Sequence, residues 1–270
     1  MTQRSARSHI QTRFLPTPRD LAILQAVRIH TRLTANQIRR LFFRGPGDRL
    51  KAPQTVNARL RRLVSYGYLE AVVVDRGHGA GPLAYGLGSR ARSLISRSTA
   101  GRLRGPGPVL HQLEIAEFRV KLEEVLRSHS GALIEWLGEP TLRSLAHARR
   151  SWPVPDALVH WRLENREGTF LLETDRATES LAILAAKLDR YSAYLRDRGY
   201  RRWLPGLGLR PRLAVVTTRA RAARLVRLIQ NERRSKSLTI AIAPREAALR
   251  DPLAATWWRS DLSAYVSLFA

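Results

Sequence analysis

The sequence has 270 residues, with 47 Lys and Arg against 22 Asp and Glu, a formal net charge of +25 and a pI near 11.6. This length accommodates two ordinary domains, each with its own core, and the charge favours a polyanionic partner. Because cysteine is absent, disulfides, zinc fingers and thiol catalysis are excluded.

The positive charge is unevenly distributed along the chain. Residues 1–104 hold 20 basic and 4 acidic residues, whereas residues 105–270 hold 27 basic and 18 acidic residues. An arginine excess also arises from the codon bias of a GC-rich genome, which is the alternative explanation of the total charge. The near absence of carboxylates from the first part favours a surface that lies along phosphates.

The sequence contains no targeting or membrane signal that we recognise. The first residues include Arg4, Arg7 and Arg13 and lack the apolar core of a signal peptide. No apolar run approaches the ~20 residues that span a bilayer. We therefore expect a cytoplasmic protein with no membrane association.

Apolar periodicity and capping residues predict three helices at the start of the chain. These helices are 18–29 after Thr17, a short one capped by Thr34, and one from Pro53 that ends at Gly67. Two strands follow, 68–75 and 83–87, with a glycine-rich hairpin tip between them. Three helices followed by a hairpin predict a winged helix-turn-helix.

The polar face of the third predicted helix carries side chains that read bases in the major groove. Asn and Gln bind adenine in a bidentate manner, and Arg binds guanine. The candidate DNA contacts on this helix are Gln54, Thr55, Asn57, Arg59, Arg61 and Arg62. Arg76 and His78 at the hairpin tip are expected to reach a phosphate or the minor groove. The alternative is that the winged helix serves protein contact.

A run rich in glycine and proline separates the two predicted domains. Residues 97–108 are predicted to hold no regular element, so the boundaries are 1–96 for the winged helix, 97–108 for the linker and 109–270 for the second domain. The elements after the linker are predicted in the order α-β-β-β-α-β-α-β, with a helix at 109–129 and a long helix at 177–198. This order indicates an α/β domain with a central mixed sheet, and an α+β protein overall.

Acidic residues stand at two strand ends in this second domain. Asp156 follows Pro155 at the start of one strand, and Glu173 and Asp175 close the next. Side chains two apart on a strand share a face, and Asp156 lies beside them if the two strands pair. Three such carboxylates suit Mg²⁺, which can activate water for phosphodiester cleavage. The seven histidines show no metal-ligand spacing.

The element order and the Pro-Asp motif resemble the restriction-endonuclease-like fold of PD-(D/E)xK nucleases. The resemblance implies that Asp156 and Glu173 are the metal-binding acids, and that Glu114 or Glu117 supplies an acid from the first helix. The family's catalytic Lys is replaced by Asp175 here, and Lys187 or Arg176 is the candidate substitute.

The chain also resembles the replication-relaxation family, which is encoded on plasmids and integrative elements. The resemblance rests on the patterns at 34–43 and 56–69, on Pro155-Asp156-Ala157, on 172–179 and on 187–191. It implies a role in the replication or relaxation of a mobile element.

Three hypotheses follow from these observations. The first is a protein of a mobile element that binds double-stranded DNA and carries a nuclease-like domain without catalysis. The second is a Mg²⁺-dependent nuclease or nickase that uses Asp156 and Glu173; no other cofactor is expected. The third is a module that docks on a replication or conjugation protein or on a second copy of itself as a homodimer. Its candidate surface is Trp257, Trp258, Tyr265 and Phe269, which otherwise close the core.

Overall fold

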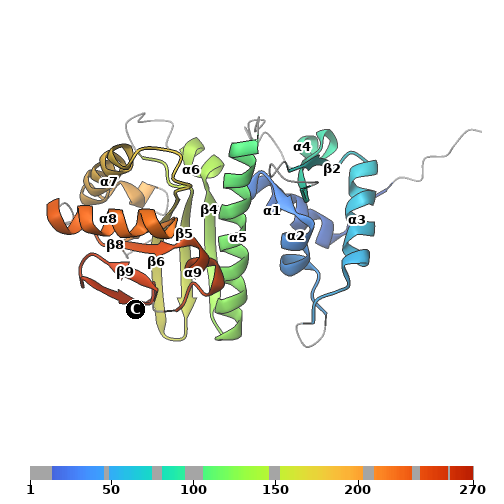
Figure 1. The fold of residues 1–270 in the computed structure, drawn as a ribbon. Helices are drawn as coiled ribbons and strands as arrows, with labels where there is room; N and C mark the ends of the chain where they lie inside the picture. The colour runs from blue at the N-terminus through green and yellow to red at the C-terminus, as the bar shows by residue number, and fades with distance from the viewer. Residues whose placement is uncertain are drawn as a thin grey trace, which may run out of the picture.

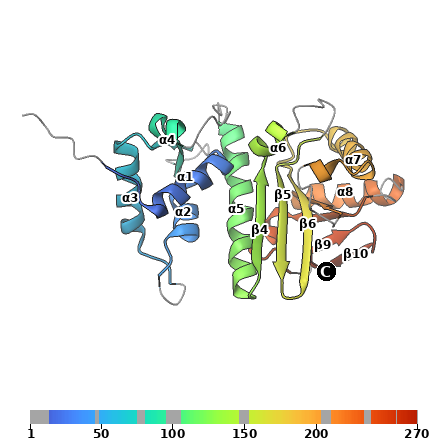
Figure 2. The same ribbon diagram turned by 180° about the vertical axis from the view of Figure 1, so that it is seen from behind.

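The computed structural model describes residues 14–45, 49–74, 81–94, 106–145, 153–202, 210–232, 238–254 and 256–269. The N-terminal unit and a larger unit lie on opposite sides of one long helix, α5 (Pro106–Ser128), as Figures 1 and 2 show from two sides.

The N-terminal unit has the three predicted helices and the two predicted strands in the predicted order, with a two-residue strand and a short last helix in addition. Its elements are α1 (Pro18–His30), β1 (Leu33–Thr34), α2 (Ala35–Phe42), α3 (Pro53–Ser65), β2 (Leu69–Val73), β3 (Leu83–Leu87) and α4 (Ser89–Leu94). The strands form an antiparallel sheet in the order β1-β3-β2. Thr17 and Thr34 each begin a helix with a capping box. Each threonine hydroxyl accepts a hydrogen bond from the backbone N–H of the third helical residue, and the side chain of that residue accepts one from the backbone N–H of the threonine.

The larger unit is built on a seven-stranded mixed sheet in the order β10-β9-β8-β7-β6-β5-β4. The strands are β4 (Ala132–Gly138), β5 (Ala157–Leu163), β6 (Arg166–Thr174), β7 (Arg212–Thr217), β8 (Ile240–Pro244), β9 (Trp257–Arg259) and β10 (Ala264–Val266). The β4-β5-β6 segment is an antiparallel meander, and β6, β7 and β8 are mutually parallel.

Helices cover both faces of this sheet. Besides α5 they are α6 (Glu139–Leu145), α7 (Leu181–Arg196), α8 (Arg219–Glu232) and α9 (Arg245–Arg250), with a 3-10 turn at Gly199–Arg202. Side chains alternate along the strands, so that Leu171 and Val215 pack with α7 and α8, whereas Phe170 and Ala214 pack with α5 and α9.

Two predicted boundaries differ from the structure. Residues 106–108, which were expected to hold no regular element, form the first turn of α5, since proline is well suited to a helix start. The helix predicted at 177–198 begins only at Leu181, because Ser180 caps it and Ala177 has a φ of 60°. None of the helices in the described parts of the chain is long and apolar enough to cross a membrane.

Candidate functional site

The third helix, α3, exposes the polar face that the sequence predicts. Its apolar residues Val56, Leu60 and Leu63 are buried against the N-terminal core. The exposed positions are Gln54, Thr55, Asn57, Arg61 and Arg62. No acidic residue occurs between Arg49 and Leu69, so the face is polar and positively charged.

Arg59 differs from the other candidates on α3 because its guanidinium is bound within the protein. It forms an ion pair with Asp20 of α1, and Arg59 Nε lies 2.7 Å from Asp20 Oδ1. Burial alone would raise the pKa of Asp20, but hydrogen bonds from Arg59 and Thr17 hold that pKa below its usual value. Arg59 thus fastens α3 to α1, and both Arg59 and Arg62 lie over the ring of Phe14. Arg76 and His78 lie outside the described residues.

Asp156 and Glu173 lie beside one another, as expected for paired strands. Strands β5 and β6 pair antiparallel with Ala157 opposite Leu172. Asp156 Oδ2 accepts a 2.7 Å hydrogen bond from the backbone N–H of Thr174. Both acids line a pocket of about 450 Å³ at the carboxyl end of β6.

Two residues of α7 enclose the carboxyl group of Glu173. Lys187 Nζ donates to Glu173 Oε2 at 2.5 Å, and the hydroxyl of Tyr191 donates to Oε1. Burial and the neighbouring charge of Asp156 raise the pKa of Glu173 to about 7, although Lys187 and Tyr191 oppose the shift. Lys187 is one of the two residues that the resemblance gave as candidate substitutes for the family's lysine, and it contacts Glu173.

His111 of α5 completes this pocket and was not singled out from the sequence. Its Nε2 lies 3.2 Å from Asp156 Oδ1. Burial alone would lower the pKa of His111, but the hydrogen bond and the charge of Asp156 raise it, with smaller effects from Glu114 and Glu139. The sequence offers no signal for this contact, since the two residues are 45 positions apart.

Asp175 lines the same pocket, but its carboxylate is bound to β7 and α8. It accepts from Thr217 Oγ1 at 2.7 Å and from Arg221 Nε at 2.5 Å. Strand β6 ends at Thr174, so the alternation that predicted a common face for Glu173 and Asp175 does not extend to this residue.

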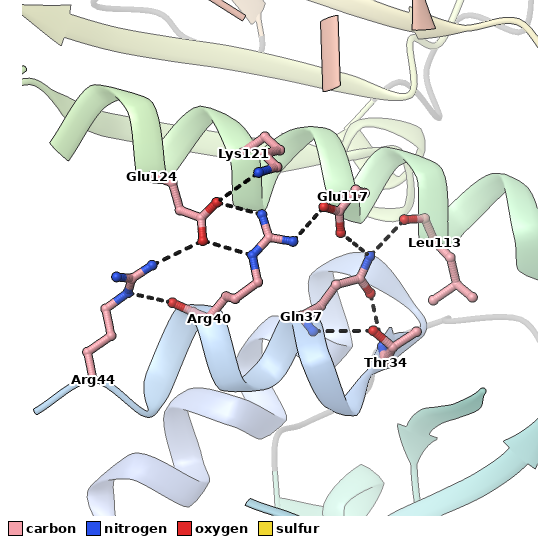
Figure 3. Close-up of polar contacts among 8 residues, drawn as sticks. All are labelled: Thr34, Gln37, Arg40, Arg44, Leu113, Glu117, Lys121 and Glu124. Carbon is pink, nitrogen blue, oxygen red and sulfur yellow. Dashed lines mark hydrogen bonds and ion pairs between the residues drawn. The ribbon is translucent and has the colours of Figure 1, made fainter. Parts of the chain in front are cut away.

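Glu117 points to the N-terminal unit and does not line the pocket (Figure 3). It accepts from Arg40 Nη1 at 2.5 Å and from Gln37 Nε2 at 3.2 Å, both on α2. Glu124, two turns later on α5, is bound by Arg40 through two nitrogens at 2.8 and 2.6 Å. Glu114, the other candidate on this helix, pairs with Arg245 and Arg176.

The acids of the pocket are bound by protein groups, whereas the sequence predicted that they bind Mg²⁺. The two oxygens of Asp156 and the two of Glu173 each have a protein hydrogen-bonding partner, and Asp175 is bound to Arg221. Within the described ranges, no group of three or more His, Asp or Glu residues is arranged to hold a metal ion. Lys187 instead places an ammonium group beside Glu173, where it supplies a positive charge.

The fold defines the larger unit as an α/β unit with a mixed sheet. Its first elements are helix α5, the antiparallel strands β4, β5 and β6 with the short α6 after β4, helix α7 and the parallel strand β7.

Comparisons with known proteins give the family. Among solved structures, restriction endonuclease FokI is similar over 85% of this chain and 42% of the FokI chain, with 13% identity and a TM-score of 0.30. FokI bound to DNA is similar over 85% of this chain and 43% of that chain, with 10% identity and a TM-score of 0.28. The chain thus spans less than half the length of FokI. The chain has no match among curated proteins. Residues 24–207 match the replication-relaxation family, and the protein belongs to that family.

Proposed function

We propose that the protein binds double-stranded DNA through the exposed face of α3 and acts in the replication or relaxation of a mobile element. The observation that carries this proposal is the set of side chains on that face, since Gln54, Asn57 and Arg61 are exposed together and are residue types that bind base edges in a bidentate manner. The order of helices and hairpin suits a winged helix-turn-helix, which inserts one helix in the major groove.

The charges of the N-terminal unit support the same proposal. Both acidic residues that the structure describes there are paired with arginines, Asp20 with Arg59 and Glu70 with Arg32. The exposed arginines of α3 therefore have little carboxylate charge beside them, as a phosphate-binding surface requires.

Binding to a mixed-sequence duplex, measured by fluorescence anisotropy between 50 and about 200 mM salt, tests this proposal. We expect a steep loss of affinity with salt. In an Arg61→Ala/Arg62→Ala variant, the slope of log affinity against log salt concentration should be smaller by about one to two released ions. The matched control is Arg224→Ala/Arg227→Ala, which removes two exposed arginines from α8. A salt-independent affinity, or equal losses in both variants, would contradict the role of α3.

We propose further that the acid pocket operates without metal-dependent DNA cleavage. The proposal rests on the contacts of Asp156 and Glu173, whose oxygens are already bound by protein groups. It rests also on the ion pair between Asp175 and Arg221. In this reading the larger unit retains the fold of a nuclease and serves the DNA-binding unit as a scaffold.

Incubation of supercoiled plasmid with Mg²⁺ or Mn²⁺ distinguishes this proposal from a nickase. We expect the parent protein and a Glu173→Ala variant to leave the plasmid equally intact. Nicking by the parent that disappears in Glu173→Ala would establish the catalytic alternative, in which Asp156 and Glu173 act on the phosphodiester.

A further inference from the structure

Phe14 precedes α1 in the chain and lies against α3. Its side chain is 5% exposed and stacks on the ring of Tyr66, with the ring centroids 4.7 Å apart and the ring planes 14° apart. Tyr68 lies at a ring separation of 5.8 Å, and its hydroxyl donates to the carbonyl oxygen of Phe14 at 3.4 Å. The two tyrosines thus hold both the ring and the backbone of Phe14 in place.

The ring of Phe14 lies under two arginines of α3. The guanidinium carbon of Arg59 is 5.1 Å from the ring centroid and that of Arg62 is 4.8 Å from it, within the range of a cation–π contact. Arg59 is also bound by Asp20, so the ring is only one of its contacts. Arg62 is exposed and forms no ion pair in the parts of the chain that the structure describes. The ring is therefore the group that fixes the guanidinium of Arg62.

A guanidinium that lies on an aromatic ring keeps its N–H donors available for a ligand. The ring contacts the face of the group, whereas the N–H bonds lie in its plane and point outward from its edge. An arginine side chain that moves freely loses rotamer freedom when it binds a partner. Arg62 has already lost part of that freedom, so it is preorganised to bind an acceptor at the surface.

The place of Arg62 on α3 favours a phosphate over a base as that acceptor. Gln54, Asn57 and Arg61 form one row along the helix, at i, i+3 and i+7. Arg62 is one residue further on, which is about 100° around the helix axis, on the side of Phe14. A helix in the major groove meets base edges with one face and has the phosphate backbones at its flanks.

We infer that Arg62 contacts a DNA phosphate beside the major groove, and that Phe14 is the positioning residue that holds its guanidinium there. The inference deepens the proposed function and rests on duplex binding by α3. It divides α3 into a row that reads base edges and a flank that sets the orientation of the helix on the duplex. Phe14, which carries no charge and lies outside α3, then contributes to DNA affinity through Arg62.

Duplex binding at several salt concentrations tests the contact between Arg62 and phosphate. In Arg62→Ala, the slope of log affinity against log salt concentration should be smaller by about one released ion. The affinity should fall by the same factor for duplexes of different sequence, because phosphates carry no sequence information. An unchanged slope, or a factor that differs among the duplexes, would overturn the assignment of Arg62 to a phosphate.

A double-mutant cycle tests the role of Phe14. Phe14→Leu retains an apolar side chain and removes the aromatic face. With Arg62 present, we expect Phe14→Leu to lower duplex affinity about three-fold, which corresponds to the loss of a surface cation–π contact. In an Arg62→Ala background, the same change should leave duplex affinity as it is. Equal losses in the two backgrounds would mean that Phe14 does not act through Arg62.

Phe43→Leu is the matched control for the stability of the fold. Phe43 is 2% exposed and also lies under an arginine, Arg19 of α1, at 5.2 Å. Both variants remove the same atoms from the N-terminal core, so we expect a similar fall in Tm. Only Phe14→Leu should lower duplex affinity. Equal losses of affinity in Phe14→Leu and Phe43→Leu would show a merely structural effect and would contradict the inference.

The same measurements separate this inference from the proposed function. If the parent does not bind a duplex, or if Arg61→Ala/Arg62→Ala binds as the parent does, duplex binding by α3 fails and the inference fails with it. If the parent binds through α3 but the losses from Phe14→Leu and Arg62→Ala add, the positioning role of Phe14 fails alone.

Discussion

At the scale of single residues, Glu173 in the larger unit has an unusual environment. It is 4% exposed and receives hydrogen bonds from Lys187 and Tyr191. Burial and the charge of Asp156 raise its pKa to about 7, so the folded protein retains a proton that an unfolded chain releases near pH 4.5. A carboxyl group in this state links the stability of the fold to pH.

The contribution of Glu173 to the free energy of unfolding is fully present below about pH 4.5 and is lost as pH rises to about 7. Glu173→Gln keeps the shape of the side chain and does not titrate. We therefore expect the stability of Glu173→Gln relative to the parent to rise across this window, by up to about 3 kcal/mol.

Urea unfolding at several pH values from 4.5 to 7.5 measures the difference. The pKa of His111 is also raised, but His111 is present in both proteins, so its own contribution largely cancels. Parallel pH profiles for the parent and Glu173→Gln would show that the pKa of Glu173 is not raised.

At the scale of elements, the sequence predicts the helices and strands whose signals are local. Thr17 and Thr34, for example, mark helix starts through hydroxyl caps. The short elements α4, α6, α9, β9 and β10 were not predicted, since three to seven residues contain too little periodicity.

The site could be predicted only as far as strand pairing determines it. Adjacent strands bring Asp156 to Glu173, and the sequence anticipated this. Which cation binds each acid depends on tertiary packing. Arg221, which lies on α8, binds Asp175, and Arg40, which lies on α2, binds Glu117. No spacing in the sequence specifies such partners.

At the scale of the whole molecule, α5 belongs to both units. Ala116 packs in the N-terminal core, whereas Ile115 and Phe118 pack in the core on the sheet. Arg40 crosses from α2 to α5 and binds Glu117 and Glu124 (Figure 3), with only 11% of its side chain exposed. These contacts fix the orientation of the N-terminal unit, and hence of α3, relative to the sheet.

Replacement of Arg40 by Met retains most of the apolar stem and leaves Glu117 and Glu124 without their main cation. An ion pair that loses one partner leaves an uncompensated charge, and the two glutamates are partly exposed. We therefore expect the free energy of unfolding to fall by about 2 kcal/mol and the Tm to fall by about 5 °C.

Lys121→Met is the matched control, since Lys121 lies 3.6 Å from Glu124 and is 34% exposed. We expect this change to lower the free energy of unfolding by less than about 1 kcal/mol. Calorimetry should show one transition for the parent and an earlier transition of the N-terminal unit for Arg40→Met, because α5 then joins the two cores by apolar packing and by the remaining contacts of Gln37 and Arg44 only. Equal Tm values for the two variants would mean that the Arg40 contacts do not couple the units.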